Sequence, residues 1–218
     1  MKRYDLHIHS DVSPDSINTP QVLLKAAKKA GLDGIAVTDH YTIEGALRTK
    51  KLNKDRKFEV IVGQEVSTCQ GELIALYIKR KIRQKKLFKA IDEIKSQGGI
   101  VIVPHPFRIV NKFEYPLHKL KGMVDGVEAM NSRYVLSNMR VSLMKPLPFA
   151  LIGSSDAHSL FDIGHAYTEF EGSLRAAIRN RKTVARGTAK YGLISQAISD
   201  INLVTKRIKK GLPLYNLL

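Results

Sequence analysis

The 218-residue chain has few of the residues that mark secreted, membrane-spanning or base-stacking proteins. Its one cysteine, Cys69, cannot form an internal disulfide, which agrees with a reducing compartment. It has no tryptophan, and its basic clusters lack interleaved aromatic residues, so platforms for stacked bases are not evident. There is no run of eighteen apolar residues, and Met1–Asp5 has no apolar signal region. These absences predict a soluble, cytoplasmic protein with no membrane partner.

Acidic residues are also scarce. The chain has 20 Asp and Glu against 36 Lys and Arg, which gives a formal net charge of +16. The basic residues cluster near 79–86, 175–186 and 206–210. Such an excess attracts anions and suits a phosphorylated small molecule, a nucleic acid or simply a solvated charged surface. We favour a small phosphorylated substrate and keep nucleic acid as the alternative partner; the oligomeric state is not predicted.

Strand and helix signals alternate along the whole chain. Short apolar runs predict strands near 3–9, 34–39, 59–67, 73–78, 100–103, 124–130, 149–153 and 166–170. Helical spacing predicts helices near 20–30, 43–51, 87–98, 134–144, 173–182 and 190–210. The last of these is amphipathic, with an apolar stripe of Leu193, Ile194, Ala197, Ile198, Ile201 and Val204. No linker or repeat is present, so we expect one α/β barrel domain over 1–218, with its motifs within 1–170 and basic helices in 171–218.

Five of the seven histidines stand at or just past the ends of apolar runs, beside acidic residues. The candidate metal ligands are His7, His9, Asp15, His40, Glu65, His105, Asp156 and His158. The carboxyl ends of parallel strands in an α/β sheet converge on one rim. Imidazoles and carboxylates crowded at one rim would repel one another or stay unpaired unless they bound cations. The pattern therefore predicts a metal cluster and an enzyme.

Individual positions in this set differ in their expected roles. His7 and His9 lie two residues apart on a strand, so both imidazoles share one face and can chelate one ion. Glu65 is our choice for a carboxylate that bridges two ions, and Asp39 is expected to orient a ligand or bind backbone and not to bind metal itself. Asp15 has the alternative role of a turn or cap residue. Imidazole and carboxylate donors without a thiolate suit Zn, Mn or Fe.

Five motifs occur in a fixed order: Asp5-Leu6-His7-Ile8-His9-Ser10, Thr38-Asp39-His40, Gly63-Gln64-Glu65, Pro104-His105-Pro106 and Gly153-Ser154-Ser155-Asp156-Ala157-His158. Over about 1–170 the chain resembles small stand-alone members of the PHP (polymerase and histidinol phosphatase) superfamily of metal-dependent phosphoesterases. The resemblance implies a distorted (β/α)7 TIM-like barrel with two or three divalent ions at the C-terminal ends of the strands. The resemblance also implies the ligands of each ion. One ion would be held by His7, His9, Glu65 and Asp156, another by Asp15, His40 and His158, and a third by Glu65 and His105.

The chain departs from this pattern at one position. Many members of the superfamily have a further histidine at the start of the strand after the Glu motif, and this chain has Gly71-Glu72-Leu73-Ile74 there. Glu72 either replaces that metal ligand or faces solvent, which leaves the number of ions and the range of substrates open.

The predicted activity is hydrolysis of a phosphate ester of a small anionic metabolite or nucleotide. A hydroxide bridging two metal ions would attack phosphorus in line, with Glu65, Asp156 and His158 as catalytic residues. Arg108, Arg133 and His165 are candidates for contacts with the substrate phosphate. One alternative is a PHP-type nuclease acting on DNA or RNA, and another is a non-catalytic, RNA-binding PHP-like protein.

Overall fold

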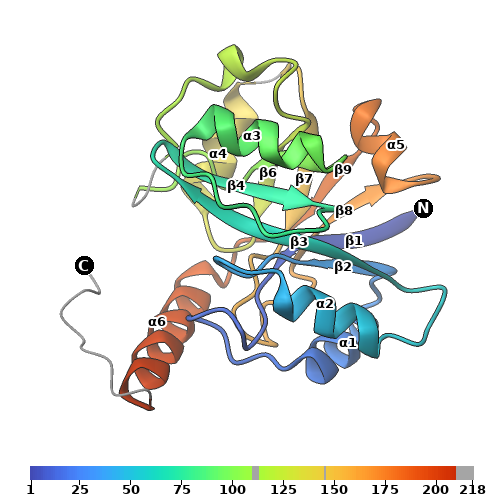
Figure 1. Cartoon of the computed structure of the whole chain (residues 1–218), viewed down its shortest axis with the longest axis vertical. Coiled ribbons are helices and arrows are strands. Elements are labelled where there is room, and N and C mark those ends of the chain that lie inside the picture. The colour runs from blue at the N-terminus through green and yellow to red at the C-terminus, as the bar shows by residue number, and fades with distance from the viewer. Residues whose placement is uncertain (110–112, 145, 210–218) are drawn as a thin grey trace.

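The sheet of this protein curls into a nearly closed barrel with helices packed around it (Figure 1). The structure is a computed structural model, and it describes residues 1–109, 113–144 and 146–209. Nine strands lie in the order β7-β6-β5-β4-β3-β2-β1-β8-β9. The predicted α/β class and barrel architecture are therefore confirmed.

The observed elements follow the predicted alternation closely. The strands are β1 (Lys2–Ile8), β2 (Gly34–Val37), β3 (Glu59–Thr68), β4 (Gly71–Leu76), β5 (Ile100–Val103), β6 (Gly126–Asn131), β7 (Ala150–Ser154), β8 (Ala166–Phe170) and β9 (Val184–Gly187). The α-helices of the described part are α1 (Pro20–Lys29), α2 (Glu44–Leu52), α3 (Leu87–Ser96), α4 (Val135–Leu143), α5 (Leu174–Arg179) and α6 (Gly192–Lys209), with a short 3-10 helix, η1, at Leu117–Leu120.

Strand direction explains both the shared rim and the distortion of the barrel. Strands β1, β2 and β3 pair in parallel, as do β5, β6 and β7, and all six point the same way. Strand β4 runs against both of its neighbours, and β8 and β9 are also antiparallel to the strands they join. The barrel closes where Ile8 bridges Ala157, so the C-terminal ends of the six parallel strands surround one opening.

Two apolar layers hold the barrel together. The interior layer includes Leu6, Ile61, Ile74 and Leu76, and residues of α5 such as Ile178 close its N-terminal end. The outer layer joins the sheet to residues such as Leu23 and Ala27 of α1 and Ile91 and Ile94 of α3. Side chains of a strand alternate between the two faces of a sheet, so a strand with apolar residues on both faces supplies both layers.

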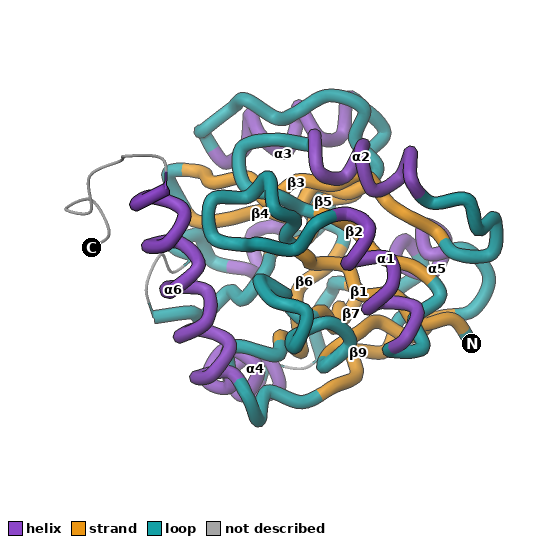
Figure 2. The backbone as a smooth tube through the Cα atoms, turned by 90° about the horizontal axis from the view of Figure 1, so that it is seen from below, coloured by secondary structure: helices purple, strands orange, loops and turns teal. Residues whose placement is uncertain are grey.

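The C-terminal part differs from its prediction in two ways. The segment 171–218, predicted as basic helices, also contains strand β9, and residues 210–218 lie outside the described residues. Helix α6 forms as expected, but its apolar stripe faces solvent: Leu193 is 90% exposed and Ile201 is 64% exposed. Its buried face consists of Gly192, Ser195, Ser199 and Asn202. In both views α6 lies at the side of the molecule opposite the N-terminus (Figures 1 and 2). No helix within the described ranges is long and apolar enough to span a membrane.

Candidate metal centre

A register shift in β1 positions the first two histidines. Asp5 pairs with Ile35 of β2, whereas Ile8 pairs with Val37, so β1 has one residue more than β2 in this stretch. Leu6 packs in the barrel interior, Ile8 packs in the outer layer, and His7 is turned toward the cluster at the rim. Irregularities of this kind often re-aim side chains beside functional sites. Both histidines of the His-x-His motif are fully buried.

Four side chains form a compact donor group. The Nε2 atoms of His7 and His9 are 3.2 Å apart, and each lies 3.2 Å from Glu65 Oε2. Asp156 Oδ1 lies 3.4 Å from His7 Nε2 and 3.5 Å from His9 Nε2. An ion held tetrahedrally at about 2.0–2.2 Å separates its ligand atoms by roughly 3.3–3.6 Å. The spacing of these donors therefore fits a single transition-metal ion.

A second group lies beside the first and shares His9 with it. The group consists of His9, Asp15, His40 and His158, whose donor atoms all lie within 4.8 Å of one another. Asp15 Oδ2 is 3.0 Å from His158 Nε2 and 3.4 Å from His40 Nε2. Ser13 Oγ donates to Asp15 Oδ1 at 2.9 Å, which fixes the orientation of that carboxylate. Asp15 thus has turn-like hydrogen bonding, but it also faces two imidazoles.

A third group forms around His105. Its Nε2 lies 3.2 Å from Glu65 Oε1 and 3.8 Å from Glu72 Oε2. Glu65 lies within β3 and not at its end, because that strand continues into the hairpin with β4. Since β4 is antiparallel, its first residues lie at the rim where the other strands end. Glu72 is therefore buried against the cluster and does not face solvent; its ligation of an ion stays a prediction.

The carboxylate of Glu128, which was not predicted as a site residue, lies behind the cluster. Glu128 Oε1 is 2.9 Å from His7 Nδ1, and Oε2 accepts hydrogen bonds from the backbone N–H of His105 and from Asn131 Nδ2, both at 2.8 Å. Ser154 Oγ also donates to it. A carboxylate partner on Nδ1 leaves Nε2 of a histidine for the metal. The sequence does carry a signal for Glu128: it is a glutamate inside an apolar strand, where burying an unpaired charge is costly.

The cluster of opposite charges shifts the pKa values of its members. Burial by itself would raise the pKa of Glu65, but the charges of His7 and His40 outweigh it and hold that pKa well below its usual range. Burial would lower the pKa of His9, yet its hydrogen bonds to Asp156 and Glu65 raise it to about 10. These shifts favour an ionised Glu65 beside a protonated His9, and a divalent ion can replace that proton.

Two of the three predicted phosphate-binding residues border the cluster. The buried guanidinium of Arg133 lies 3.8 Å from Asp156 Oδ1 and also contacts His158 Nδ1. Burial and this positive charge lower the pKa of His158 to about 4. Arg108 Nη1 lies 3.3 Å from Glu72 Oε2. His165 is placed differently: it belongs to none of the donor groups found in the described residues, and its ring packs beside Phe161 and Tyr191.

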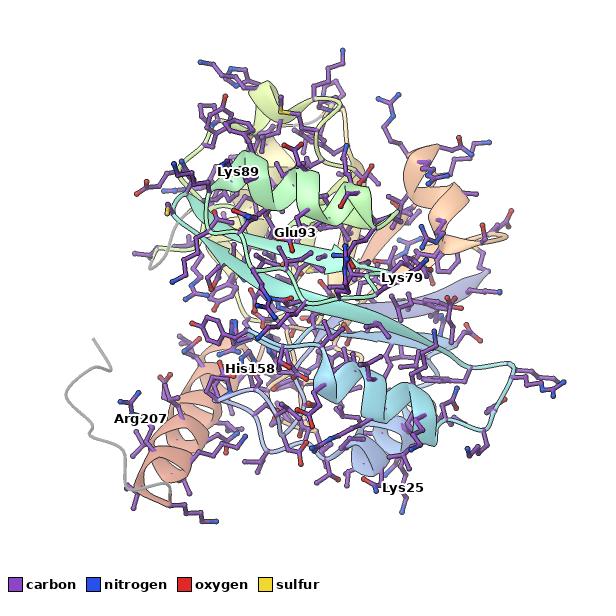
Figure 3. The ribbon with its side chains drawn as sticks, viewed as in Figure 1. Lys25, Lys79, Lys89, Glu93, His158 and Arg207 are labelled. Atoms are coloured by element: carbon purple, nitrogen blue, oxygen red, sulfur yellow. The ribbon has the colours of Figure 1, made fainter. Side chains whose placement is uncertain are left out.

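Helix α6 is attached to the cluster through its polar face. Gln196 accepts a hydrogen bond from Arg133 Nη2 at 2.7 Å, and Asn202 Nδ2 donates to the backbone oxygen of His158 at 3.4 Å. Lys206 Nζ donates to the backbone oxygens of Asp11 and Ser13, each at 2.7 Å. Figure 3 shows His158 beside this helix. These contacts explain why the polar face of α6 is the buried one.

The strand-end backbone is strained at two of the ligand positions. His105 has φ +25° and Asp156 has φ +56°, and residues other than glycine rarely adopt such positive φ angles. Such conformations cluster at functional sites, where the surrounding structure enforces them. Together the donor set, its spacing and its outer carboxylate fit divalent metal ions. Asp39 accepts hydrogen bonds from the backbone N–H and the hydroxyl of Ser10.

Comparisons with known proteins agree with this site. The model of the PHP domain family matches residues 5–146, and that of a PHP-associated family matches residues 141–183. An uncharacterized protein of Methanocaldococcus jannaschii is 36% identical over 165 residues, which cover 66% of this chain and 92% of the relative.

Solved structures with the same fold include the following two. A two-domain protein from Bacteroides vulgatus, which contains a predicted PHP-like metal-dependent phosphoesterase, superposes with a TM-score of 0.64 at 25% identity. The match covers 86% of this chain and 65% of that one. A lesion-specific endonuclease from Pyrococcus furiosus superposes with a TM-score of 0.61 at 15% identity, over 82% of this chain and 56% of the endonuclease.

Proposed function

The chain belongs to the PHP domain family, and we propose that it hydrolyses a phosphate ester of a small anionic metabolite or nucleotide with the help of divalent metal ions. The observation that carries this proposal is the compact group of His7, His9, Glu65 and Asp156, whose donor atoms are spaced for a transition-metal ion. Glu65 connects this group to His105 through its second oxygen. Zn, Mn or Fe would suit such donors.

The residues in and around the cluster would have different roles in this hydrolysis. Bound ions would supply a water of lowered pKa as nucleophile and charge stabilisation for the phosphoryl oxygens. The carboxylates of Glu65 and Asp156 and the imidazole of His158 hold the reacting groups in place. Arg133 and Arg108, which lie at the edge of the cluster, would bind the non-reacting phosphate oxygens with fixed N–H donors. No protein nucleophile is needed.

The position of the α5 arginines favours a small substrate over a polymer. Helix α5 carries Arg175 and Arg179, and Arg175 donates to the backbone oxygen of Gly98, just before β5 begins. This helix therefore lies at the end of the barrel away from the cluster, near the N-terminus in both views (Figures 1 and 2). A nuclease needs its basic surface beside the reacting phosphate to follow the backbone of the polymer. The nuclease remains the second candidate because Lys206 of α6 lies on the cluster side.

The test begins with the metal content of the purified protein, measured for Zn, Mn and Fe. The same preparation is then assayed against phosphomonoesters, nucleotides, bis-p-nitrophenyl phosphate and single-stranded DNA and RNA. We expect turnover of at least one small ester, and loss of that turnover in His7→Ala, because the variant lacks a metal-binding nitrogen. His118→Ala is the matched control, since His118 is exposed in η1. Inactivity of the metal-loaded protein on every small ester would refute the proposal, and turnover of oligonucleotides alone would favour the nuclease.

A further inference from the structure

A cavity of about 780 Å³ opens beside the cluster, between the N-terminal ends of α4 and α6 and the segment that follows β5. Its apolar wall is formed by Phe107, Val135, Leu136, Leu193 and Ile194. Val135 and Leu136 of α4 are 50% and 52% exposed, and Leu193 and Ile194 of α6 are 90% and 54% exposed. Figure 2 shows α4 beside the end of α6 that forms this cavity. Apolar side chains from two helices thus face the same open space.

The cavity shares a wall with the metal centre. Arg108, Arg133 and Tyr134 all line it. Arg108 contacts Glu72, and Arg133 contacts Asp156, as described above. The ring of Tyr134 packs edge-on against that of His105, with 5.0 Å between the ring centroids. A molecule whose phosphate lies against the two arginines therefore has its remaining atoms directed toward this cavity.

Helix α6 packs very closely against the backbone of Arg133. Gly192 lies so close to the backbone of Arg133 that a side-chain carbon there would collide with it. Gln196, one turn later, holds the Arg133 guanidinium. The helix thereby fixes the arginine with its polar face and brings the neighbouring Leu193 and Ile194 to the cavity. Contiguous exposed apolar surface on a protein commonly marks a binding site.

We propose that this cavity binds the organic part of the phosphate ester, and that this part is an apolar group of ring size, such as an aryl group. This inference rests on the proposed function and adds the chemical class of the substrate. The volume lies within the ~300–1,000 Å³ of small-molecule sites, whose walls are mainly apolar with a few convergent polar groups. A strongly hydrated alcohol such as glycerol would leave the apolar walls without a partner.

The test compares the binding of two non-hydrolysable phosphonates, 1-naphthylmethylphosphonate and methylphosphonate, by isothermal titration of the metal-loaded and metal-free protein. We expect 1-naphthylmethylphosphonate to bind the wild type at least tenfold more tightly than methylphosphonate does. In Ile194→Glu and in Leu136→Glu, on opposite walls of the cavity, we expect this preference to fall to about threefold or less. Methylphosphonate should bind these variants as it binds the wild type. All four substituted positions, the two controls included, are exposed, so folding is not at risk.

The matched controls are Ile201→Glu on α6 and Leu143→Glu on α4, which introduce the same charge on the same helices outside the cavity. They should retain the preference. Equal binding of both phosphonates by the wild type, or an unchanged preference in both cavity variants, would overturn the inference. So would a wild-type dimer in size-exclusion chromatography that Ile194→Glu dissociates, because the surface would then be a contact between copies. Failure of the proposed function is distinguishable: the phosphonate preference would persist while no ester is turned over.

Discussion

Replacing Glu128 by glutamine removes one negative charge behind the metal centre and keeps the size of the side chain. The carboxylate has four donors: His7 Nδ1 at 2.9 Å, the backbone N–H of His105 and Asn131 Nδ2 at 2.8 Å, and Ser154 Oγ. Since an ionised carboxylate can only accept hydrogen bonds, it keeps the His7 proton on Nδ1 and leaves Nε2 for an ion. A glutamine has one accepting oxygen, so its NH₂ group must face at least one of these donors.

The expected loss of metal affinity follows from these hydrogen bonds. Loss of a hydrogen-bonding partner behind a metal ligand typically costs 10–100-fold in metal affinity, or about 1.4–2.8 kcal/mol. We expect the upper end for Glu128→Gln because the carboxylate supports His7 through its side chain and His105 through its backbone. Both residues face Glu65, so one substitution disturbs two of the donor groups.

The assay is a competition titration in which a chromogenic chelator and the protein share a limiting amount of Zn. The control is Glu59→Gln at the start of β3, where the carboxylate accepts a hydrogen bond from Tyr4 at 2.9 Å, at the other end of the barrel. Circular dichroism checks that both variants fold. An affinity of Glu128→Gln equal to that of the control would show that Glu128 does not prepare His7 for metal binding.

Three further predictions concern the same centre. Glu72→Gln should weaken one metal equivalent and reduce turnover less than His7→Ala, because its carboxylate lies at the edge of the cluster, 3.8 Å from His105 Nε2; metal stoichiometry by titration checks this. Removal of the ions by a chelator should lower the melting temperature reversibly, because metal stabilises only the folded state. Metal uptake near pH 7 should release protons, since the raised pKa of His9, about 10, keeps it protonated in the metal-free protein. Titrations in buffers of different ionisation enthalpy measure this proton release, and metal uptake without it would contradict the prediction. The apparent metal affinity should also rise with pH up to about 10.

Most elements could be predicted because their signals are local. Val60–Val62 and Ile100–Val103 are short apolar runs, and the structure has strands at both places. The candidate ligands could also be named, since His7, His40, His105 and Asp156 follow or end such runs and parallel strands end at one rim. Whether they hold metal ions stays a prediction, although their donor atoms do lie together.

Other features depend on partners far away in the sequence. The reversed direction of β4, which brings Glu72 to the rim, follows from hairpin pairing with β3 and not from its apolar pattern. Strand β9 was not predicted, because its Val184–Gly187 segment has little apolar character and forms by pairing with β8. The ring of His165 packs beside Tyr191, which sequence order could not show because it gives no direction for a loop side chain; its contact with a phosphate stays a prediction.

The sequence by itself determined the alternation of strands and helices and the inventory of imidazoles and carboxylates, because both depend on residue type and short-range spacing. Only the tertiary structure decided which face of α6 is buried. Hydrophobic periodicity predicts that an apolar stripe packs inward, but the polar face of α6 finds hydrogen-bond partners at Arg133 and His158. A buried charge left without partners costs more than an apolar side chain left in water. The helix therefore packs with its polar face toward the cluster, and Leu193, Ile194, Ile201 and Ile208 are left exposed.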